Sequence, residues 1–392
     1  MTIPRTYLDW NATAPLRPEA RAAVLAALEV AGNPSSVHAE GRQARGIIEK
    51  ARRQVAVLVG AEPHAVIFTG SATEAAAQVL SRHWSDAQMD RLSVSAIEHP
   101  CVLAGGQFAP QDVARLAVTA AGKLDISVLK QHINNHDPEL GRPLLALMLA
   151  NNETGLIQPV AEAAAIVHAA GGYLVCDAVQ AAGRICVDLK TLGADALLLS
   201  AHKLGGPKGV GALILADEAV APAPLIRGGG QERGRRAGTE NVAAIAGFGA
   251  AAEAALAGLV TMPHLAALRD ALESRISTPS VTPLSRVESG SSRAKTGPTR
   301  LPNTTLVALP GAKAETLVIQ LDLAGIAVSA GSACSSGKVK RSHVLDAMGI
   351  DPAIAEGTIR VSLGSTTTAA DIERFLAAWA EIAARHKSLR VA

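Results

Sequence analysis

Short apolar runs alternate along the chain with alanine-rich or amphipathic segments. The runs that predict strands span 65–69, 92–97, 143–150, 172–176, 196–199 and 212–215. Between and before them, the segments 18–30, 38–59 and 160–170 have the length and pattern of helices. Strands that alternate with helices predict an α/β fold with a mostly parallel central sheet.

Polar residues follow the carboxyl ends of several predicted strands. They are Thr73, His99, Asn152, Asp177, Gln180, Ser200, His202 and Lys203. A single polar residue at a strand end is usually a turn former. In a parallel sheet, however, the carboxyl ends share one edge, and ligands bind beyond that edge. The repeated pattern therefore favours one shared site.

Lys203 is the most reactive member of this set. It lies in Ser200-Ala-His-Lys-Leu-Gly-Gly-Pro-Lys-Gly-Val-Gly211, between two apolar runs. A lone lysine at a strand end most often extends into solvent. A lysine in a dry pocket has a lowered pKa instead, and its neutral amine can form a Schiff base with an aldehyde. The other strand-end residues favour this second interpretation.

The segment Gly70-Ser-Ala-Thr-Glu74 links a predicted strand to an alanine-rich helix. Ser71 and Glu74 match the S-x-x-E capping box. A helix that begins at a strand end directs its free N–H groups at the strand tip, where they can bind an anion, and Thr73 adds a hydroxyl. Taken alone, such a segment is more often an ordinary capped helix.

An anion-binding helix end, a carboxylate and a lysine together suit pyridoxal phosphate. Asp177 would hold the pyridine nitrogen protonated, Lys203 would bind the aldehyde, and His99 could stack on the ring. A dinucleotide would instead require G-x-G-x-x-G after the first strand, and no such pattern follows Phe68.

An ordered set of motifs resembles the pyridoxal-phosphate cysteine desulfurases of the NifS/IscS type, in the class V aminotransferase-like family. The motifs are Tyr7-Leu-Asp9 with Asn11-Ala-Thr, Gly32-Asn-Pro-Ser-Ser-Val-His38, Ala72-Thr-Glu74, Glu98-His-Pro100, Asn151-Asn-Glu153, Asp177-Ala-Val-Gln180, Ser200-Ala-His-Lys203, Arg236-Ala-Gly-Thr-Glu-Asn241, Ser332-Ala-Cys-Ser335 and Ile359-Arg-Val-Ser-Leu363. The resemblance implies the aspartate-aminotransferase-like fold (fold type I), with a smaller α+β domain beside the large one.

The resemblance also implies a role for each candidate residue. The catalytic residues would be Cys334, Lys203 and His99, and no resident metal is expected, apart from a transient cluster contact at Cys334. The cofactor would contact Ala72, Thr73, His99, Asn152, Asp177, Gln180, Ser200, His202, Lys203 and, from a neighbouring subunit, Thr239. The substrate would contact Asn152 and Arg360. An arginine fork matches a carboxylate, although Arg360 alone could equally form a surface salt bridge.

Cys334 lies among small polar residues in Gly331-Ser-Ala-Cys-Ser-Ser-Gly337, near basic residues that could favour its thiolate. A lone free cysteine is more often inert. The resemblance implies that Cys334 takes sulfur from L-cysteine as a persulfide, releases L-alanine and passes the sulfur on. The receiver would be a sulfur acceptor or iron–sulfur scaffold protein, in iron–sulfur cluster assembly or another thio-cofactor or tRNA pathway. Cys101 could border the site, whereas we expect Cys176 and Cys186 to be packing residues.

Composition and charge limit the classes of partner and the cellular locations that the sequence suggests. A net charge of +2 gives no reason to expect nucleic acid or an anionic membrane as a partner. The four cysteines show no C-x-x-C spacing, and Met1–Trp10 lacks a signal pattern. The apolar stretch 243–260 is typical of a packed helix. We therefore expect a cytoplasmic protein with free thiols, and the family resemblance implies a homodimer.

The predicted large, cofactor-binding domain spans 16–255. The small domain combines 1–15 with 256–392 and carries the catalytic cysteine loop; within it, 278–300 has the composition of an exposed loop or insertion. The basic segment 227–236 is either a solvated turn or, by the resemblance, part of the dimer interface.

The chain departs from the family pattern at two places. Gly70-Ser71 reverses the usual order, and Ala75-Ala-Ala77 stands where asparagines are common. The missing amides could weaken a phosphate contact or only alter helix packing. Two other classes stay open: a different pyridoxal enzyme of this fold, such as an aminotransferase or selenocysteine lyase, and a non-catalytic sulfur-assembly partner. The presence of Lys203, Asp177 and Cys334 argues against the second.

Overall fold

The structure, a computed structural model, describes residues 5–276, 299–330 and 341–391, with side chains to residue 388. Its main feature is an eight-stranded sheet with the order β2-β9-β8-β7-β6-β4-β3, in which β5 also pairs with β4. The strands are β2 (Val66–Thr69), β3 (His83–Trp84), β4 (Ala87–Ser95), β5 (Val113–Leu116), β6 (Arg142–Met148), β7 (Tyr173–Asp177), β8 (Ala196–Ser200) and β9 (Gly211–Leu215).

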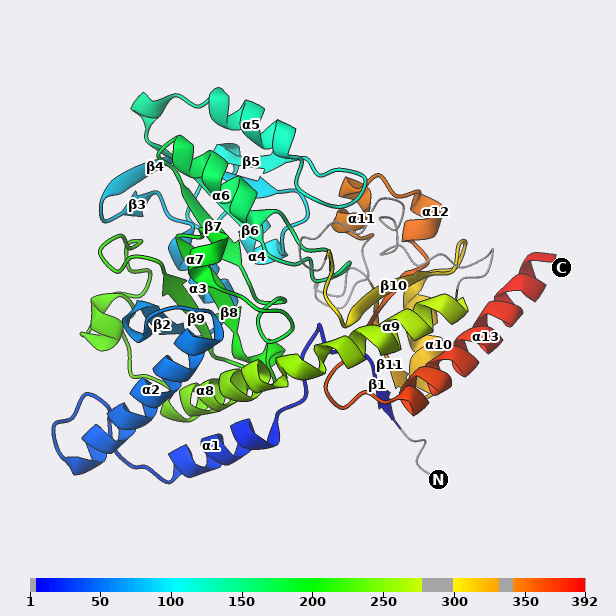
Figure 1. The fold of residues 1–392 in the computed structure, drawn as a ribbon, viewed down its shortest axis with the longest axis horizontal. Coiled ribbons are helices and arrows are strands. Elements are labelled where there is room, and N and C mark those ends of the chain that lie inside the picture. The colour runs from blue at the N-terminus through cyan, green and yellow to red at the C-terminus, as the bar shows by residue number, and fades with distance from the viewer. Residues whose placement is uncertain (1–4, 277–298, 331–340, 392) are drawn as a thin grey trace.

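The prediction of a mostly parallel sheet is confirmed. β5, β4, β6, β7 and β8 run parallel to one another, whereas β9 is antiparallel to both β8 and β2, and β3 is antiparallel to β4. The central strands are apolar along their length and buried on both faces, as helices on both sides of a parallel sheet require. Helices surround this sheet in Figure 1.

The helices of this part include the predicted segments 18–30, 38–59 and 160–170, close to their predicted bounds. They are α1 (Pro18–Leu28), α2 (Ala39–Leu58), α3 (Ala72–Val79), α4 (Pro100–Leu103), α5 (Ile126–Asn134), α6 (Val160–Ala169), α7 (Leu189–Leu192) and α8 (Val242–Ala257). Two short 3₁₀ segments, Ala201–Lys203 and Gln231–Gly234, lie between β8 and α8.

The helical run Val242–Ile276, which comprises α8 and α9 (Met262–Ile276), is long and apolar enough to cross a membrane by length and composition. In the structure α8 packs against α1 and α2. Phe248 is fully buried there, and a Cβ at position 249 would lie 2.5 Å from Ala51 Cα. Close packing of this kind is typical of a core helix, as the sequence predicted.

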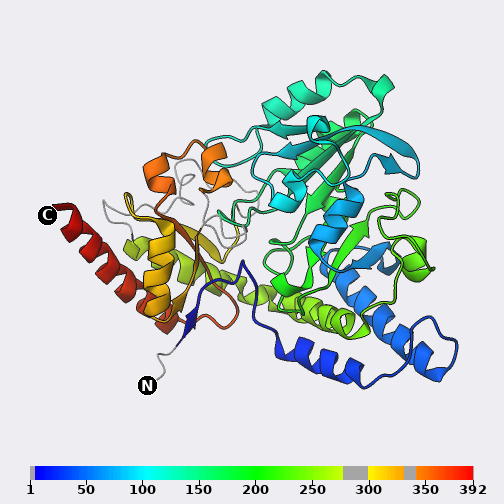
Figure 2. The same ribbon diagram turned by 180° about the vertical axis from the view of Figure 1, so that it is seen from behind.

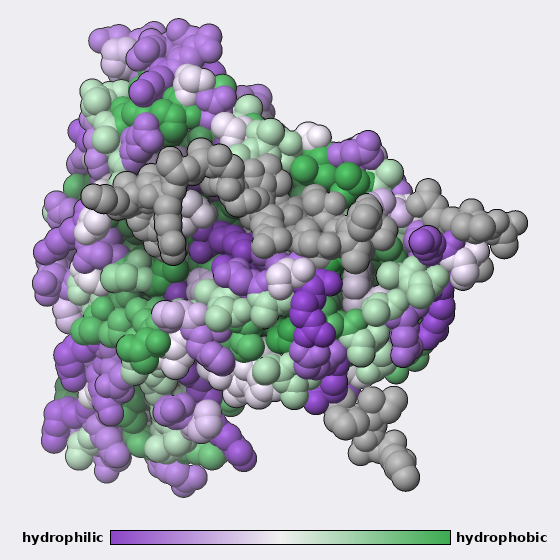
Figure 3. Space-filling view, turned by 45° about the vertical axis from the view of Figure 1, so that its right-hand side comes forward, coloured by the Kyte–Doolittle hydropathy of each residue, from purple (hydrophilic) through white to green (hydrophobic). Residues whose placement is uncertain are grey.

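A second, smaller group of elements contains a three-stranded antiparallel sheet of β10 (Thr304–Ala308), β13 (Thr358–Ser362) and β12 (Ser329–Ala330). Its helices are α10 (Ala314–Leu323), α11 (His343–Ala347), α12 (Pro352–Ala355) and α13 (Ala369–Val391). On the face in Figure 3, hydrophilic and hydrophobic residues both reach the surface.

The N-terminal segment joins this smaller group. β1 (Thr6–Tyr7) pairs in parallel with β11 (Ile326–Ala327), and Leu8 is fully buried in the same apolar cluster as Phe375. Figure 2 shows this segment beside the C-terminal elements before the chain passes on to α1. The arrangement agrees in outline with the predicted division of the chain, whose boundaries stay a prediction.

Candidate active site

A cavity of about 290 Å³ opens beyond the carboxyl ends of the parallel strands. The sequence predicted ten of its lining residues: Ala72, Thr73, His99, Asn152, Asp177, Gln180, Ser200, His202, Lys203 and Arg360. Sequence reasoning did not assign Asn11, Ala12, Ser71, Met148, Ala150 and Val179 to the site. The shared site inferred from the strand ends is therefore present in the fold.

The local structure explains why these residues meet. Asp177 ends β7 and Ser200 ends β8, while Lys203 ends the 3₁₀ turn that follows β8. His99 caps α4, just beyond β4. Because these parallel strands end at one edge of the sheet, residues far apart in sequence line one cavity.

The N-terminus of α3 forms one end of the cavity. Ser71 Oγ accepts a hydrogen bond from Glu74 N at 3.1 Å, as the capping box predicts. The Glu74 carboxylate returns to Gly70 N at 2.8 Å, where a Cβ would lie 2.7 Å from Glu74 Oε2. The glycine at position 70 therefore lets Glu74 fold back. The first N–H groups of the helix, at Ala72 and Thr73, are left for a ligand.

Two of the alanines that replace the family's asparagines pack in an apolar core. Ala75 and Ala76 are fully buried in the cluster that also contains Val79 and Leu80. Their position favours the interpretation that these substitutions alter helix packing.

Asp177 is a buried carboxylate in the middle of the site. Burial raises its pKa to about 6, against the opposing effects of a hydrogen bond from Val179 N, at 2.9 Å, and the nearby Lys203 charge. A buried carboxylate is costly without a cationic partner. The position therefore suits a group that brings a positive charge into the cavity.

Both histidines of the site favour the neutral form. Burial, together with the nearby charges of Lys203 and His343, lowers the pKa of His99 to about 4. Burial also lowers the pKa of His202 to about 4. His202 Nδ1 lies 3.2 Å from Thr13 Oγ1, so this ring is tied to the N-terminal segment.

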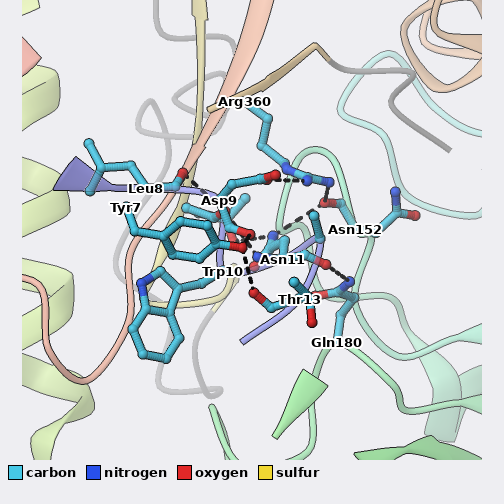
Figure 4. Close-up of polar contacts among 12 residues, drawn as sticks. Tyr7, Leu8, Asp9, Trp10, Asn11, Thr13, Asn152, Gln180 and Arg360 are labelled. Carbon is cyan, nitrogen blue, oxygen red and sulfur yellow. Dashed lines mark hydrogen bonds and ion pairs between the residues drawn. The ribbon is translucent and has the colours of Figure 1, made fainter. Parts of the chain in front are cut away.

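Backbone carbonyls of the N-terminal segment hold the reactive lysine. Lys203 Nζ donates to Asn11 O at 2.6 Å and to Ala12 O at 2.8 Å. Gln180 Nε2 donates to the same Asn11 carbonyl at 3.0 Å, and Arg184 Nη1 donates to Gln180 Oε1 at 2.6 Å. Figure 4 shows the Asn11–Gln180 contact. The motif Asn11-Ala-Thr was part of the family resemblance, but no site role was predicted for Asn11.

Arg360 projects from β13 into the same cavity, with 3% of its side chain exposed. Its Nη2 lies 2.9 Å from Asp9 Oδ1, and its Nη1 donates to Asn152 O at 2.9 Å (Figure 4). Its Nε is buried without a hydrogen-bond partner among the residues that the structure describes. Arg360 is therefore a pocket residue, and the alternative of a surface salt bridge is wrong.

The remaining sequence predictions concern Cys334, Thr239, Cys176 and Cys186. Cys334 lies outside the described residues. Thr239 is exposed and does not line the cavity of its own chain. Cys176 is buried, as expected, whereas Cys186 is exposed, so its assignment as a packing residue was wrong. Cys186 lies in the loop that follows β7. The apolar residue beside it, Ile185, was therefore not a reliable sign that Cys186 is buried.

The full length of the chain matches known proteins of one family. The Aminotransferase class-V family model matches residues 6–375. A cysteine desulfurase of Cereibacter sphaeroides is 44% identical over 380 residues, which cover 95% of this chain and 94% of the relative. An IscS-like cysteine desulfurase of Mycobacterium tuberculosis is 37% identical, with 94% of both chains covered.

Solved structures agree with these matches. The structure of a NifS-like protein from Rickettsia africae superposes with a TM-score of 0.84 at 34% identity, covering 96% of this chain and 99% of the other. A structure described as SspA in complex with cysteine gives a TM-score of 0.73 at 28% identity, covering 91% and 98%. The chain belongs to the class-V aminotransferase family, whose members of this kind use pyridoxal phosphate. Within that family it is a cysteine desulfurase of the NifS/IscS type.

Proposed function

We propose that this chain binds pyridoxal phosphate in the described cavity, converts L-cysteine to L-alanine and receives the sulfur on Cys334. The observation that supports the proposal most directly is the meeting of Lys203, Asp177 and the α3 N-terminus in one cavity. An aminotransferase would also need this cofactor-binding cavity, but its reaction would not require the cysteine of the Cys334 motif.

The residues present suit this cofactor. The free N–H groups of Ala72 and Thr73 would hold the phosphate, with the hydroxyl of Ser200 nearby. The strand β9 can approach this point because position 211 is glycine: a Cβ there would lie 2.5 Å from Ser71 C. The buried Asp177 carboxylate would gain a cationic partner in the pyridine nitrogen. The Lys203 amine would bind the aldehyde.

When bound, pyridoxal phosphate supplies an aldehyde for amines and a ring that withdraws electrons from the substrate's α-carbon. The protein's own residues do the rest. Lys203 must leave the carbonyl oxygens of Asn11 and Ala12 before its amine can react. Arg360, already oriented by Asp9 and Asn152, would bind the substrate carboxylate. Neutral His99 can accept or return a proton beside the ring.

The sulfur transfer then balances without an added oxidant. The Cys334 thiolate attacks the sulfur of L-cysteine, an S–S bond forms and the substrate's Cβ–S bond breaks. The electron pair of the broken bond stays with the organic product, which takes up a proton and leaves as L-alanine. Cys334 keeps a persulfide, which an external sulfur acceptor or iron–sulfur scaffold protein would then receive.

A direct test follows the sulfur itself. After a single turnover with L-cysteine in the absence of reductant, mass spectrometry of the peptide that contains Cys334 should show the addition of one sulfur atom. The added mass should disappear with reductant and should not form with L-alanine. A sulfur atom found on Cys101 or Cys186 instead, or on no cysteine, would contradict the assignment.

We also propose that Thr239 completes the cofactor site of a second copy of the chain. Its exposure, outside the cavity of its own chain, supports this role. The segment before it is held in a fixed shape, because buried Glu232 accepts from Arg52 at 2.7 Å and from Phe68 N at 3.0 Å. A surface segment anchored so firmly can present Thr239 to a partner.

Mixing two inactive variants tests this arrangement. In a mixed dimer of Lys203→Ala and Thr239→Ala subunits, one site would have both wild-type residues if Thr239 acts across the interface. Cofactor affinity and activity should then rise after mixing, above those of either variant alone. If Thr239 acts within its own chain, mixing would restore neither quantity.

A further inference from the structure

Cys101 lies against His99 inside the candidate active site. The thiol Sγ is 3.0 Å from His99 Nδ1, and the backbone N–H of Cys101 donates to the same nitrogen at 3.2 Å. Both residues line the cavity, and Cys101 lies in the first turn of α4, which His99 caps. Two groups of a single residue therefore converge on one ring nitrogen.

The backbone contact decides the state of the ring. A backbone N–H can only donate, so Nδ1 must offer a lone pair. The neutral ring then carries its proton on Nε2. The same lone pair can accept a hydrogen bond from a thiol S–H. A thiolate has no proton to donate and could not form this hydrogen bond.

We propose that Cys101 is a positioning residue, whose thiol donates to His99 Nδ1 and, together with the backbone N–H, helps to hold the imidazole in the Nε2–H form. The inference rests on the proposed function, because it assigns His99 a proton-handling place beside the cofactor. It assigns Cys101 no contact with the reacting atoms. Its effect on the reaction passes through His99.

The surroundings of the thiol keep its proton in place. Burial raises the pKa of Cys101 to about 12, and the nearby Asp177 and Glu98 carboxylates act in the same direction. A hydrogen bond with the Thr73 hydroxyl opposes this effect. The thiol also lies between Thr73, at the phosphate-binding helix end, and the ring of His99. A buried thiol with so high a pKa is a poor nucleophile, so Cys101 is not a second sulfur carrier.

The groups that face His99 favour the same state. Lys203, from the turn after β8, and His343, from α11, both disfavour a positive charge on the ring. The buried carboxylates of Asp177 and Glu98 act on the Cys101 thiol, and burial raises the pKa of each. Removing the thiol leaves these groups unchanged, so a change in the titration of His99 would report on the thiol itself.

The test uses the cofactor-free full-length protein labelled with ¹⁵N-histidine. Long-range ¹H–¹⁵N spectra report the tautomer and titration of each ring, and a His99→Gln variant assigns the signals. In the wild type, His99 should show the Nε2–H form. In Cys101→Ala it should titrate about one pH unit higher, because one of two donors to Nδ1 is lost.

Cys101→Ser keeps a donor and should restore the wild-type titration, while Cys186→Ala is a matched control at an exposed cysteine. Cys101→Val, which fills the space without a donor, replaces the alanine variant if that protein does not fold. Wild-type titration in the alanine or valine variant would overturn the proposal, as would a serine variant that behaves like alanine. Because the spectra need no turnover, loss of desulfurase function and loss of ring positioning are separate results.

Discussion

Asp9 and Arg360 form a partly buried ion pair that ties the N-terminal segment to the substrate end of the cavity. The pair joins Asp9 Oδ1 to Arg360 Nη2 at 2.9 Å, across most of the length of the sequence. Together with the Asn152 carbonyl, it fixes the guanidinium in one orientation (Figure 4). The N-terminal segment therefore belongs to the site as much as the strand ends do.

Replacing Asp9 with alanine should impair substrate binding. The variant leaves the Arg360 charge buried without its carboxylate partner, which typically costs about 2–5 kcal/mol. We expect kcat/KM for L-cysteine to fall about 10- to 100-fold, mainly through KM, and Tm to fall as well. Steady-state kinetics and thermal unfolding measure the two effects.

The matched control for this variant is Asp322→Ala. Asp322 also pairs with an arginine, Arg5, but both side chains are more than half exposed. Surface pairs of this kind contribute little, so the control should keep wild-type KM. An unchanged KM in Asp9→Ala would show that the pair does not orient Arg360 for substrate.

Asp177 should make the cofactor-free protein less stable at high pH. Its pKa rises from 3.8 unfolded to about 6 folded, so its contribution favours folding below about pH 4 and is lost as the pH rises through 6. Asp177→Asn removes the free-energy cost of keeping a charged carboxylate buried in the folded protein at high pH. Without cofactor, the variant should exceed the wild type at pH 8 by on the order of 2–3 kcal/mol.

Urea unfolding of both proteins at pH 4 and pH 8 measures that difference, which should nearly vanish at the lower pH. The same substitution should weaken cofactor binding and activity, because the pyridine nitrogen loses its carboxylate. A variant that is less stable than the wild type at pH 8 would contradict the assignment of an uncompensated buried carboxylate.

Lys203→Ala should abolish turnover and the visible absorbance of the bound cofactor. The cofactor's aldehyde needs an amine to bind to, and no other lysine lines the described cavity. Lys208→Ala is the matched control, because Lys208 lies in the same glycine-rich segment and is exposed. Absorbance spectra and alanine formation measure the outcome. Retained absorbance and turnover in Lys203→Ala would move the covalent attachment to another residue.

Much of this site was predictable from the sequence, because the relevant signals are local. A polar residue directly after a buried strand, as at Asp177 or Ser200, lies at a known edge of a parallel sheet. A capping box after a strand marks a helix end, as at Ser71. These features depend on neighbours in sequence, so the pattern of the chain was sufficient to find them.

The contacts that were missed depend on tertiary structure. Asn11 and Asp9 reach the site only because β1 pairs with β11, more than three hundred residues away. A pairing of two residues per strand leaves almost no periodic signal. The exposure of Cys186 was also missed: Cys176 lies in a central strand and is buried as predicted, whereas Cys186 lies in the loop that follows and is exposed.

The most direct test of the account is the formation of alanine from L-cysteine, with a reductant present, by the wild type, Cys334→Ala and Cys186→Ala. The account predicts rapid formation by the wild type and Cys186→Ala, and almost none by Cys334→Ala, although that variant still binds pyridoxal phosphate. Equal alanine formation by Cys334→Ala and the wild type would contradict sulfur transfer to Cys334.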